Sequence, residues 1–291
     1  MNNYTVRSDL AAECVEGGAQ GEGILFNERS RADVGISEMR ITSESASEKI
    51  GKPIGKYITL DIGRSWIEDD KRIMEIIDAL HGELSEFIDE CGISLDNTLV
   101  AGLGNRSITS DALGPLAVDG LTVTRHIKIL DPALFERLGT ECVSAISPGV
   151  AGQTGFETFD LIAAAAAEIS PSLIIIIDAL AARSTKRLAT TVQLTDTGIS
   201  PGSGIGNNRK RMTREDLGAP VIVIGVPTIV DSGTLVRDAL TEAGIEEIPE
   251  SLSEVLDNGQ NFFVTLKESD VAIESLSRII SSSLNKLFQT A

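Results

Sequence analysis

The sequence predicts an α/β fold, a three-layer sandwich built on a mostly parallel central sheet, and three observations lead to this prediction. Segments 98–103 and 173–178 are almost entirely apolar, as strands are when helices cover both faces of a parallel sheet. Strand-like and helix-like segments alternate along the chain with short connections. A hydrophobic fraction of 42% supplies enough apolar side chains for a core of this size.

Each element is predicted from its own pattern. Alternation of apolar and polar residues at 57–62 predicts a strand, and apolar residues at helical spacing from 66 to 91 predict an amphipathic helix. The strand at 98–103 leads through a loop to a helix that begins near Pro115. Further strands are predicted at 141–146, 173–178, 190–194 and 221–226. Further helices are predicted up to about residue 169 and over residues 232–243 and 268–287.

The first 50 residues differ from the rest. They are polar, rich in Glu, Ser and Gly, and carry only short apolar patches, which suits either a loosely ordered arm or an edge hairpin. No internal repeat or linker interrupts the remainder. We therefore expect one α/β domain over residues 10–291, with a polar N-terminal arm to about residue 50.

Composition excludes several classes of function. The net charge is −18, from 25 Lys and Arg against 43 Asp and Glu, so that nucleic acid and anionic membranes should be repelled. There is no apolar run of about 18 residues and no signal-like start, which predicts a soluble cytoplasmic protein. The three cysteines have no metal-binding spacing, and the only histidines are His81 and His126. No metal and no cofactor are predicted.

Two aspartates follow the two apolar segments. Asp111 and Asp178 would lie along one edge if both strands belong to one parallel sheet, because ligand sites form beyond the carboxyl ends of such strands. Each aspartate alone is equally well explained as a helix cap. As a pair, their pKa values would separate, so that one carboxylate acts as base while the other holds a proton. This suits activation of water against a peptide carbonyl, and also metal binding if a third ligand exists.

The glycine-rich loop at 196–211 ends in a basic cluster. Arg209, Lys210 and Arg211 could bind an acidic substrate residue beside the carboxylates, or could belong to a solvated surface loop. A Walker motif and a helix-opening GxGxxG are both missing, which argues against nucleotide binding.

Several long motifs resemble the germination protease family, the spore endopeptidases of endospore-forming bacteria. The resemblance extends over about residues 4–235, and its motifs lie at 102–105, 110–115, 123–126, 147–150, 177–183, 196–207 and 223–228. It implies an α/β sandwich similar to that of hydrogenase maturation proteases. It also implies a tetrameric zymogen that removes its own propeptide, acts in the forespore and spore core, and degrades small acid-soluble spore proteins. The family's proposed catalytic pair matches Asp111 and Asp178.

The resemblance also predicts a processing site. The family cuts after an acidic residue and before a bulky apolar one, in a pattern like Glu-Ile/Phe-Ala-Ser-Glu. The chain carries Asp9-Leu10-Ala11-Ala12-Glu13, so we expect self-cleavage between Asp9 and Leu10 and a propeptide of residues 1–9. A similar stretch at 43–48 lacks the bulky apolar residue after Glu44 and should stay uncut.

Two other functions remain open. A metal-dependent peptidase of the hydrogenase maturation type would place a histidine among its ligands, whereas His126 falls in a predicted helix after Asp111. A non-enzymatic α/β binding module is the second alternative. The aspartic-type mechanism, without a covalent intermediate, accounts best for scarce histidine and paired aspartates.

Overall fold

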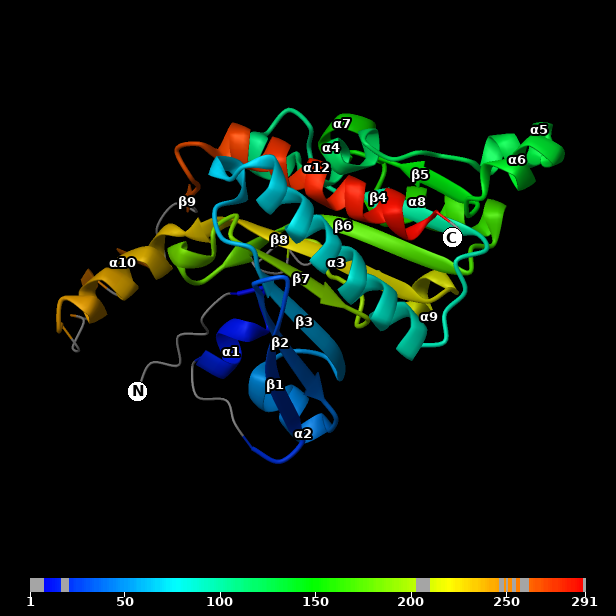
Figure 1. Cartoon of the computed structure of the whole chain (residues 1–291). Coiled ribbons are helices and arrows are strands. Elements are labelled where there is room, and N and C mark those ends of the chain that lie inside the picture. Colours follow the sequence, from blue (N-terminus) through cyan, green and yellow to red (C-terminus); the bar gives the residue numbers. More distant parts are fainter. Residues whose placement is uncertain are drawn as a thin grey trace.

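The computed structural model describes residues 8–16, 21–202, 210–245, 249, 251–252, 255–256 and 262–289. Within these residues, one sheet of nine strands runs through the molecule in the order β1-β2-β3-β7-β8-β6-β4-β5, with β9 beside β8 (Figure 1). The strands are β1 Ile24–Arg31, β2 Val34–Ile41, β3 Gly55–Asp61, β4 Thr98–Gly102, β5 Val143–Ile146, β6 Leu173–Ala182, β7 Thr191–Thr195, β8 Val221–Asp231 and β9 Phe263–Val264.

The helices alternate with these strands along most of the chain. The α-helices are α1 Ala12–Glu16, α2 Glu44–Ile50, α3 Asp70–Glu90, α4 Leu113–Asp119, α5 Arg125–Leu130, α6 Pro132–Leu138, α7 Ala151–Thr154, α8 Thr158–Ile169, α9 Arg214–Leu217, α10 Ser232–Glu242 and α12 Ser269–Leu287. Short 3-10 helices are η1 Ser65–Ile67, η2 Thr109–Asp111 and η3 Thr185–Arg187. The long helix predicted at 66–91 begins only at Asp70, because the Asp69 side chain accepts the Arg72 N–H and caps it there.

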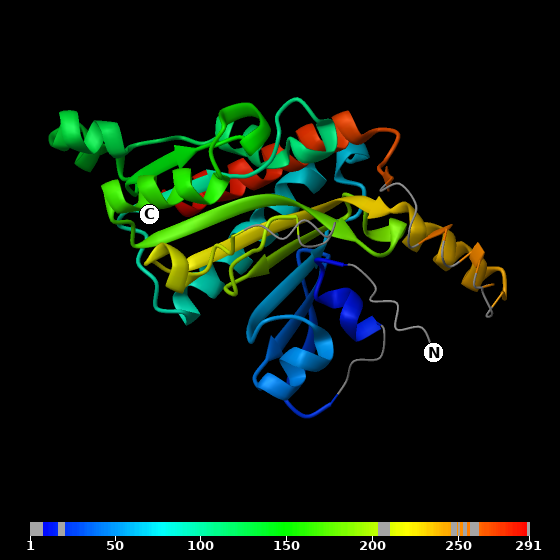
Figure 2. The same ribbon diagram turned by 180° about the vertical axis from the view of Figure 1, so that it is seen from behind.

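Strands β5, β4, β6 and β8 form the parallel half of the sheet, and helices cover both of its faces. Helices α3, α4 and α12 share one apolar core with the first face, and α8 shares a second core with the opposite face (Figures 1 and 2). The predicted α/β sandwich is therefore confirmed. No helix among the described residues is both long and apolar enough to cross a membrane.

The sheet as a whole is mixed, because its other half is antiparallel. β7 pairs antiparallel with both β8 and β3, and the hairpin β1–β2 continues the sheet beyond β3. Residues Ala32 and Asp33 alone join β1 to β2, both with positive φ, and so short a loop can only connect antiparallel strands. Of the two readings of the N-terminal region, the structure shows the edge hairpin. The expected mostly parallel order thus holds only for the other half.

Strands β6 and β8 are longer than the sequence pattern predicted. Apolar runs predict ends at 178 and 226, whereas the strands continue to Ala182 and Asp231. They pair with each other along this extra length, past a bulge at Leu180 and Ala181. Pairing between distant segments, rather than local hydrophobicity, sets where these strands end, and Asp178 consequently lies inside a strand.

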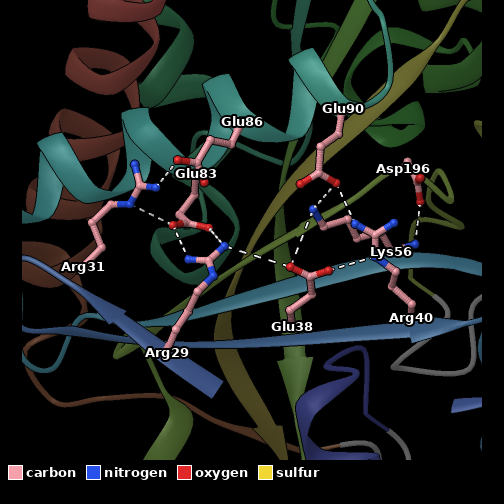
Figure 3. A network of polar contacts seen from close by, with 9 residues as sticks. All are labelled: Arg29, Arg31, Glu38, Arg40, Lys56, Glu83, Glu86, Glu90 and Asp196. Carbon is pink, nitrogen blue, oxygen red and sulfur yellow. Dashed lines mark hydrogen bonds and ion pairs between the residues drawn. The ribbon is translucent and has the colours of Figure 1, made fainter. Parts of the chain in front are cut away.

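Ion pairs hold the N-terminal hairpin against α3 (Figure 3). Glu83 of α3 is fully buried and pairs with Arg29 and Arg31 of β1. Lys56 of β3 lies 2.8 Å from Glu90 of α3. These contacts make the hairpin a part of the main body rather than a separate arm.

Candidate active site

Asp111 lies just beyond the end of β4, in η2. Its Oδ2 accepts a hydrogen bond of 2.8 Å from the Asn105 N–H. The N-cap of α4 is Ala112, which makes no side-chain cap. The helix-cap interpretation of Asp111 is therefore wrong, since its carboxylate instead anchors the loop that follows β4.

Gly104 allows Asp111 to approach this loop. Its φ is +115°, and a Cβ there would lie 2.0 Å from the carbonyl oxygen of Asp111 and 2.9 Å from its Oδ1. The neighbouring Leu103 N–H donates to the Ile177 carbonyl at 2.8 Å. The loop that holds Asp111 is thus tied to β6 at the residue before Asp178.

Asp178 lies within β6, opposite Gly225 of the parallel strand β8. Only 7% of the residue is exposed, and its Oδ1 accepts the N–H of Ala179 at 2.9 Å. A residue inside a strand caps no helix, so the structural alternative for Asp178 fails as well.

Both aspartates line one cavity of about 490 Å³, as the sequence predicts for one sheet edge. Asp9 lines the same cavity, and so does Arg211 from the basic cluster. The wall is largely apolar or weakly polar and includes Leu103, Ile108, Leu180, Gln193, Thr195 and Phe263. The cavity therefore combines acidic groups with room for a peptide side chain.

The N-terminal segment, residues 8–13, is docked beside these aspartates. The Asp9 N–H donates to the Ala181 carbonyl at 2.9 Å, and the Ala181 N–H donates to Asp9 Oδ2 at 2.9 Å. Leu10 is fully buried. The predicted cleavage residues thus contact β6, the strand that carries Asp178. The contact is at Ala181, three residues beyond Asp178, which corresponds to roughly 10 Å along the strand.

The basic cluster does not act as one unit. Lys210 lies 2.8 Å from Asp160 of α8 and over the ring of Phe159, whereas Arg211 is exposed and lines the cavity. Arg209 lies outside the described residues. Arg211 is therefore the member of the cluster in a position to meet an acidic group in the site.

The histidines and cysteines lie apart from the aspartates or are poorly suited to react. His126 is on α5 and lines a different cavity, with Val123 and Ile129. Burial raises the pKa of the Cys14 thiol, which favours the protonated form. In the part of the chain that is described, no three His, Cys, Asp or Glu side chains group as metal ligands would.

Sequence reasoning missed Gln193 and the backbone of residues 181–184. Gln193 is 5% exposed and lies in the middle of β7. Both its amide oxygen and its amide nitrogen hydrogen-bond the docked segment. A buried amide inside a short strand was the available signal, because such a group needs partners. Backbone N–H groups have no sequence signal, so their role in the site appears only in three dimensions.

One carboxylate inside β6 and one in the loop after β4, with the N-terminal segment docked beside them, define an α/β protein with an acidic site that already holds a peptide segment. Comparison with known proteins identifies the family: the family model described as germination protease matches residues 6–244. The chain belongs to the germination protease family, and it is therefore a peptidase connected with spore germination.

Two of the curated relatives are germination proteases that cover most of this chain. The germination protease of Bacillus subtilis (strain 168) is 42% identical over 82% of this chain and 67% of its own length. That of Clostridium perfringens is 37% identical over 98% of this chain and 96% of its own. A solved NiFe hydrogenase maturation protease from Thermococcus kodakarensis KOD1 is 16% identical, with a TM-score of 0.35, and covers 65% of this chain and 92% of its own.

Proposed function

We propose that this peptidase is an endopeptidase that starts the degradation of small acid-soluble spore proteins during germination. It cuts after an acidic residue and before a bulky apolar one, and Asp111 and Asp178 are its catalytic pair. The observation that carries the proposal is the single cavity lined by both aspartates and by Asp9. An acidic residue of a peptide segment thus already lines the cavity that the two carboxylates share.

The reaction needs one carboxylate in each protonation state. The ionised carboxylate takes a proton from water, and the resulting hydroxide equivalent attacks the peptide carbonyl. The protonated partner donates to the carbonyl oxygen. As the tetrahedral intermediate collapses, the carboxyl that took the water proton gives it to the nitrogen of the leaving amine, and a hydroxyl of the intermediate returns a proton to the other carboxylate. No covalent intermediate forms. Because two close carboxylates titrate as a unit, the roles belong to the pair.

The enzyme processes itself and then acts as a tetramer in the forespore and spore core. Cleavage between Asp9 and Leu10 removes residues 1–9, and this bond already lies in the docked segment beside the cavity. The similar stretch at 43–48 largely lies in α2, where the backbone is hydrogen-bonded within the helix. We propose that it stays uncut for this reason, and because a serine follows Glu44.

Substitution of the two aspartates tests this function. Asp111→Asn and Asp178→Asn should each lower self-processing and peptide cleavage by about 10²–10⁴-fold, the usual contribution of a general acid or base. Asp160→Asn, on the exposed surface of α8, is the matched control and should keep full activity. Mass spectrometry follows processing, and the processed wild-type chain should begin at Leu10.

Three outcomes would contradict the proposal. The pair is wrong if both variants still process themselves and cut substrate. An active purified form that begins at Met1 would refute self-cleavage at Asp9. Stoichiometric metal in the active protein, with loss of activity on chelation, would favour the metal-dependent alternative.

A further inference from the structure

Strand β6 continues past the end of its neighbour β4 and leaves an edge beside the catalytic cavity. β4 ends at Gly102, opposite Ile177, whereas β6 continues to Ala182. The N-terminal segment lies along this edge and runs in the same direction as β6, because Asp9 meets Ala181 and Glu13 meets Arg183. Among the described residues, one backbone hydrogen bond, from the Asp9 N–H to the Ala181 carbonyl, joins the segment to this edge, and the segment continues as helix α1 from Ala12.

Gln193 binds the backbone of the segment on the other side. Its Oε1 accepts the Ala11 N–H at 2.7 Å, and its Nε2 donates to the Asp9 carbonyl at 3.3 Å. These bonds hold the two backbone groups that flank Leu10. Because they involve only the backbone of the bound segment, any peptide with the same backbone conformation, which continues from Ala12 as helix α1, can make them.

The side chains of the segment meet three distinct surroundings. The Asp9 carboxylate accepts from the Ala181 N–H, and Leu10 packs without exposure in an apolar cluster with Leu180, Leu188 and Val230. Ala11 is also fully buried, so that a larger side chain would not fit at its place. The contacts therefore select an acidic, then an apolar, then a small residue.

Glu13 adds a fourth point of selection. Its Oε2 accepts the Arg183 N–H at 2.8 Å, and its Oε1 accepts the Ser184 N–H at 2.9 Å. The Ser8 hydroxyl donates to the same carboxylate, which is 6% exposed. Two converging backbone N–H groups at a buried carboxylate form an anion site, and hydrogen bonds to a charged group are stronger than neutral ones.

We propose that this surface is the specificity groove of the protease. The groove consists of residues 180–184 with Leu188, Gln193 and Val230. It binds an acidic residue before the cleaved bond, an apolar residue after it, a small residue next, and a second acidic residue three positions after the apolar one. The chain's own residues 9–13 fill it first and thereby exclude substrates. The inference rests on the proposed endopeptidase function and names the residues that recognise its substrates.

Competition between the segment and a free peptide tests the groove. The probe is a fluorescent peptide of residues 4–16, with Cys14 replaced by serine and the Asp–Leu amide N-methylated, which keeps the Asp9 carbonyl that Gln193 binds and resists hydrolysis. Fluorescence anisotropy measures its binding to the full-length chain. Glu13→Gln in the protein should raise the probe's affinity at least tenfold, because it weakens the competing segment. The exposed Glu22→Gln is the matched control and should bind the probe as the wild type does.

The anion site is tested separately, in the Glu13→Gln protein. Ser184→Pro removes one of the two N–H donors. It should weaken binding of the probe about tenfold, whereas binding of a probe with Gln in place of Glu should stay unchanged. Thr185→Pro is the control, because proline fits the first position of η3. Retained binding of the Gln probe shows that the Ser184→Pro protein is folded.

The outcomes separate the groove from the catalytic proposal. Equal binding of the Glu and Gln probes, or no effect of Glu13→Gln, overturns the groove even if the enzyme cuts peptides. Selective binding without any cleavage leaves the groove standing and refutes the endopeptidase function instead.

Discussion

Asp111 depends on a backbone position where no side chain fits. At Gly104 a Cβ would collide with the carbonyl oxygen of Asp111, at 2.0 Å, and this atom belongs to the rigid main chain of η2. The loop cannot relieve the collision by moving away, because Leu103 is hydrogen-bonded to Ile177 of β6. The catalytic proposal therefore predicts a strong effect from a single methyl group.

Gly104→Ala should displace Asp111. It should therefore lower the rate of peptide cleavage much more than a variant in which alanine only strains the backbone. The control is Gly92→Ala, also at positive φ (+61°), where nothing lies within 4 Å of the added Cβ. We expect Gly92→Ala to lose about 1–2 kcal/mol of unfolding free energy with little loss of activity. Urea unfolding and a peptide assay on both variants measure the difference, and equal activities would show that Gly104 does not position Asp111.

The partly buried carboxyl of Asp196 makes the stability of the fold depend on pH. Burial raises the pKa of its carboxyl, and the hydrogen bond from the Lys56 N–H, at 2.9 Å, opposes this. The folded state therefore binds the Asp196 proton more tightly than the unfolded state does. Its contribution to stability is complete below the ordinary aspartate pKa and is lost as pH rises through the raised value.

Asp196→Asn should remove this pH dependence, since the amide oxygen can still accept from Lys56 and carries no charge. Relative to wild type, the variant should gain unfolding free energy as pH rises from about 4 to 7. Urea unfolding across this range measures the difference. A difference that stays constant with pH, or falls, would contradict the raised pKa.

At the scale of elements, the ion pairs in Figure 3 join the edge hairpin to α3. Glu83 is fully buried and receives two arginines of β1, whereas Glu86 is half exposed and pairs with Arg31. A buried charge that loses its partner is costly, and an exposed pair contributes little. The hairpin's attachment should thus depend on Glu83 far more than on Glu86.

Glu83→Gln should lower the free energy of unfolding by about 2–3 kcal/mol, less than the loss of a fully buried pair, because the two arginines that lose this carboxylate are about a third exposed. Glu86→Gln, one helical turn along the same face, is the control and should cost less than about 1 kcal/mol. Urea midpoints at constant slope give both values. Similar losses in the two variants would mean that burial of Glu83 adds nothing to the attachment.

At the scale of the whole molecule, α5 and α6 project from one end of the body (Figure 1). Their exposed apolar residues include Ile129 at 60% and Leu130 at 81% exposure, as is common where a further chain packs. The proposed tetramer should have a mass of about 124 kDa, four times 30.9 kDa. Sedimentation of the full-length chain measures this, and a species of 30.9 kDa would contradict the proposal.

The pattern of apolar segments predicted the α/β fold and the places of the main strands, because burial on both faces leaves a local mark in the sequence. The ends of β6 and β8 could not be predicted, because pairing with each other and with the N-terminal segment decides them. The two aspartates were predicted as a pair on one edge, and the shared cavity agrees. Their alternative role as helix caps was removed only by the observed backbone.

By itself, the sequence determined the α/β class, the family and the candidate residues Asp111 and Asp178. Apolar periodicity and motif residues are local properties, so they can be recognised from the order of residues alone. Only the tertiary structure decided that the sheet is mixed, that Asp9 meets the strand of Asp178, and that backbone N–H groups receive Glu13. The last two features join segments 172 and 170 residues apart through main-chain N–H groups that nearly every residue carries, and so they leave no pattern in the order of side chains.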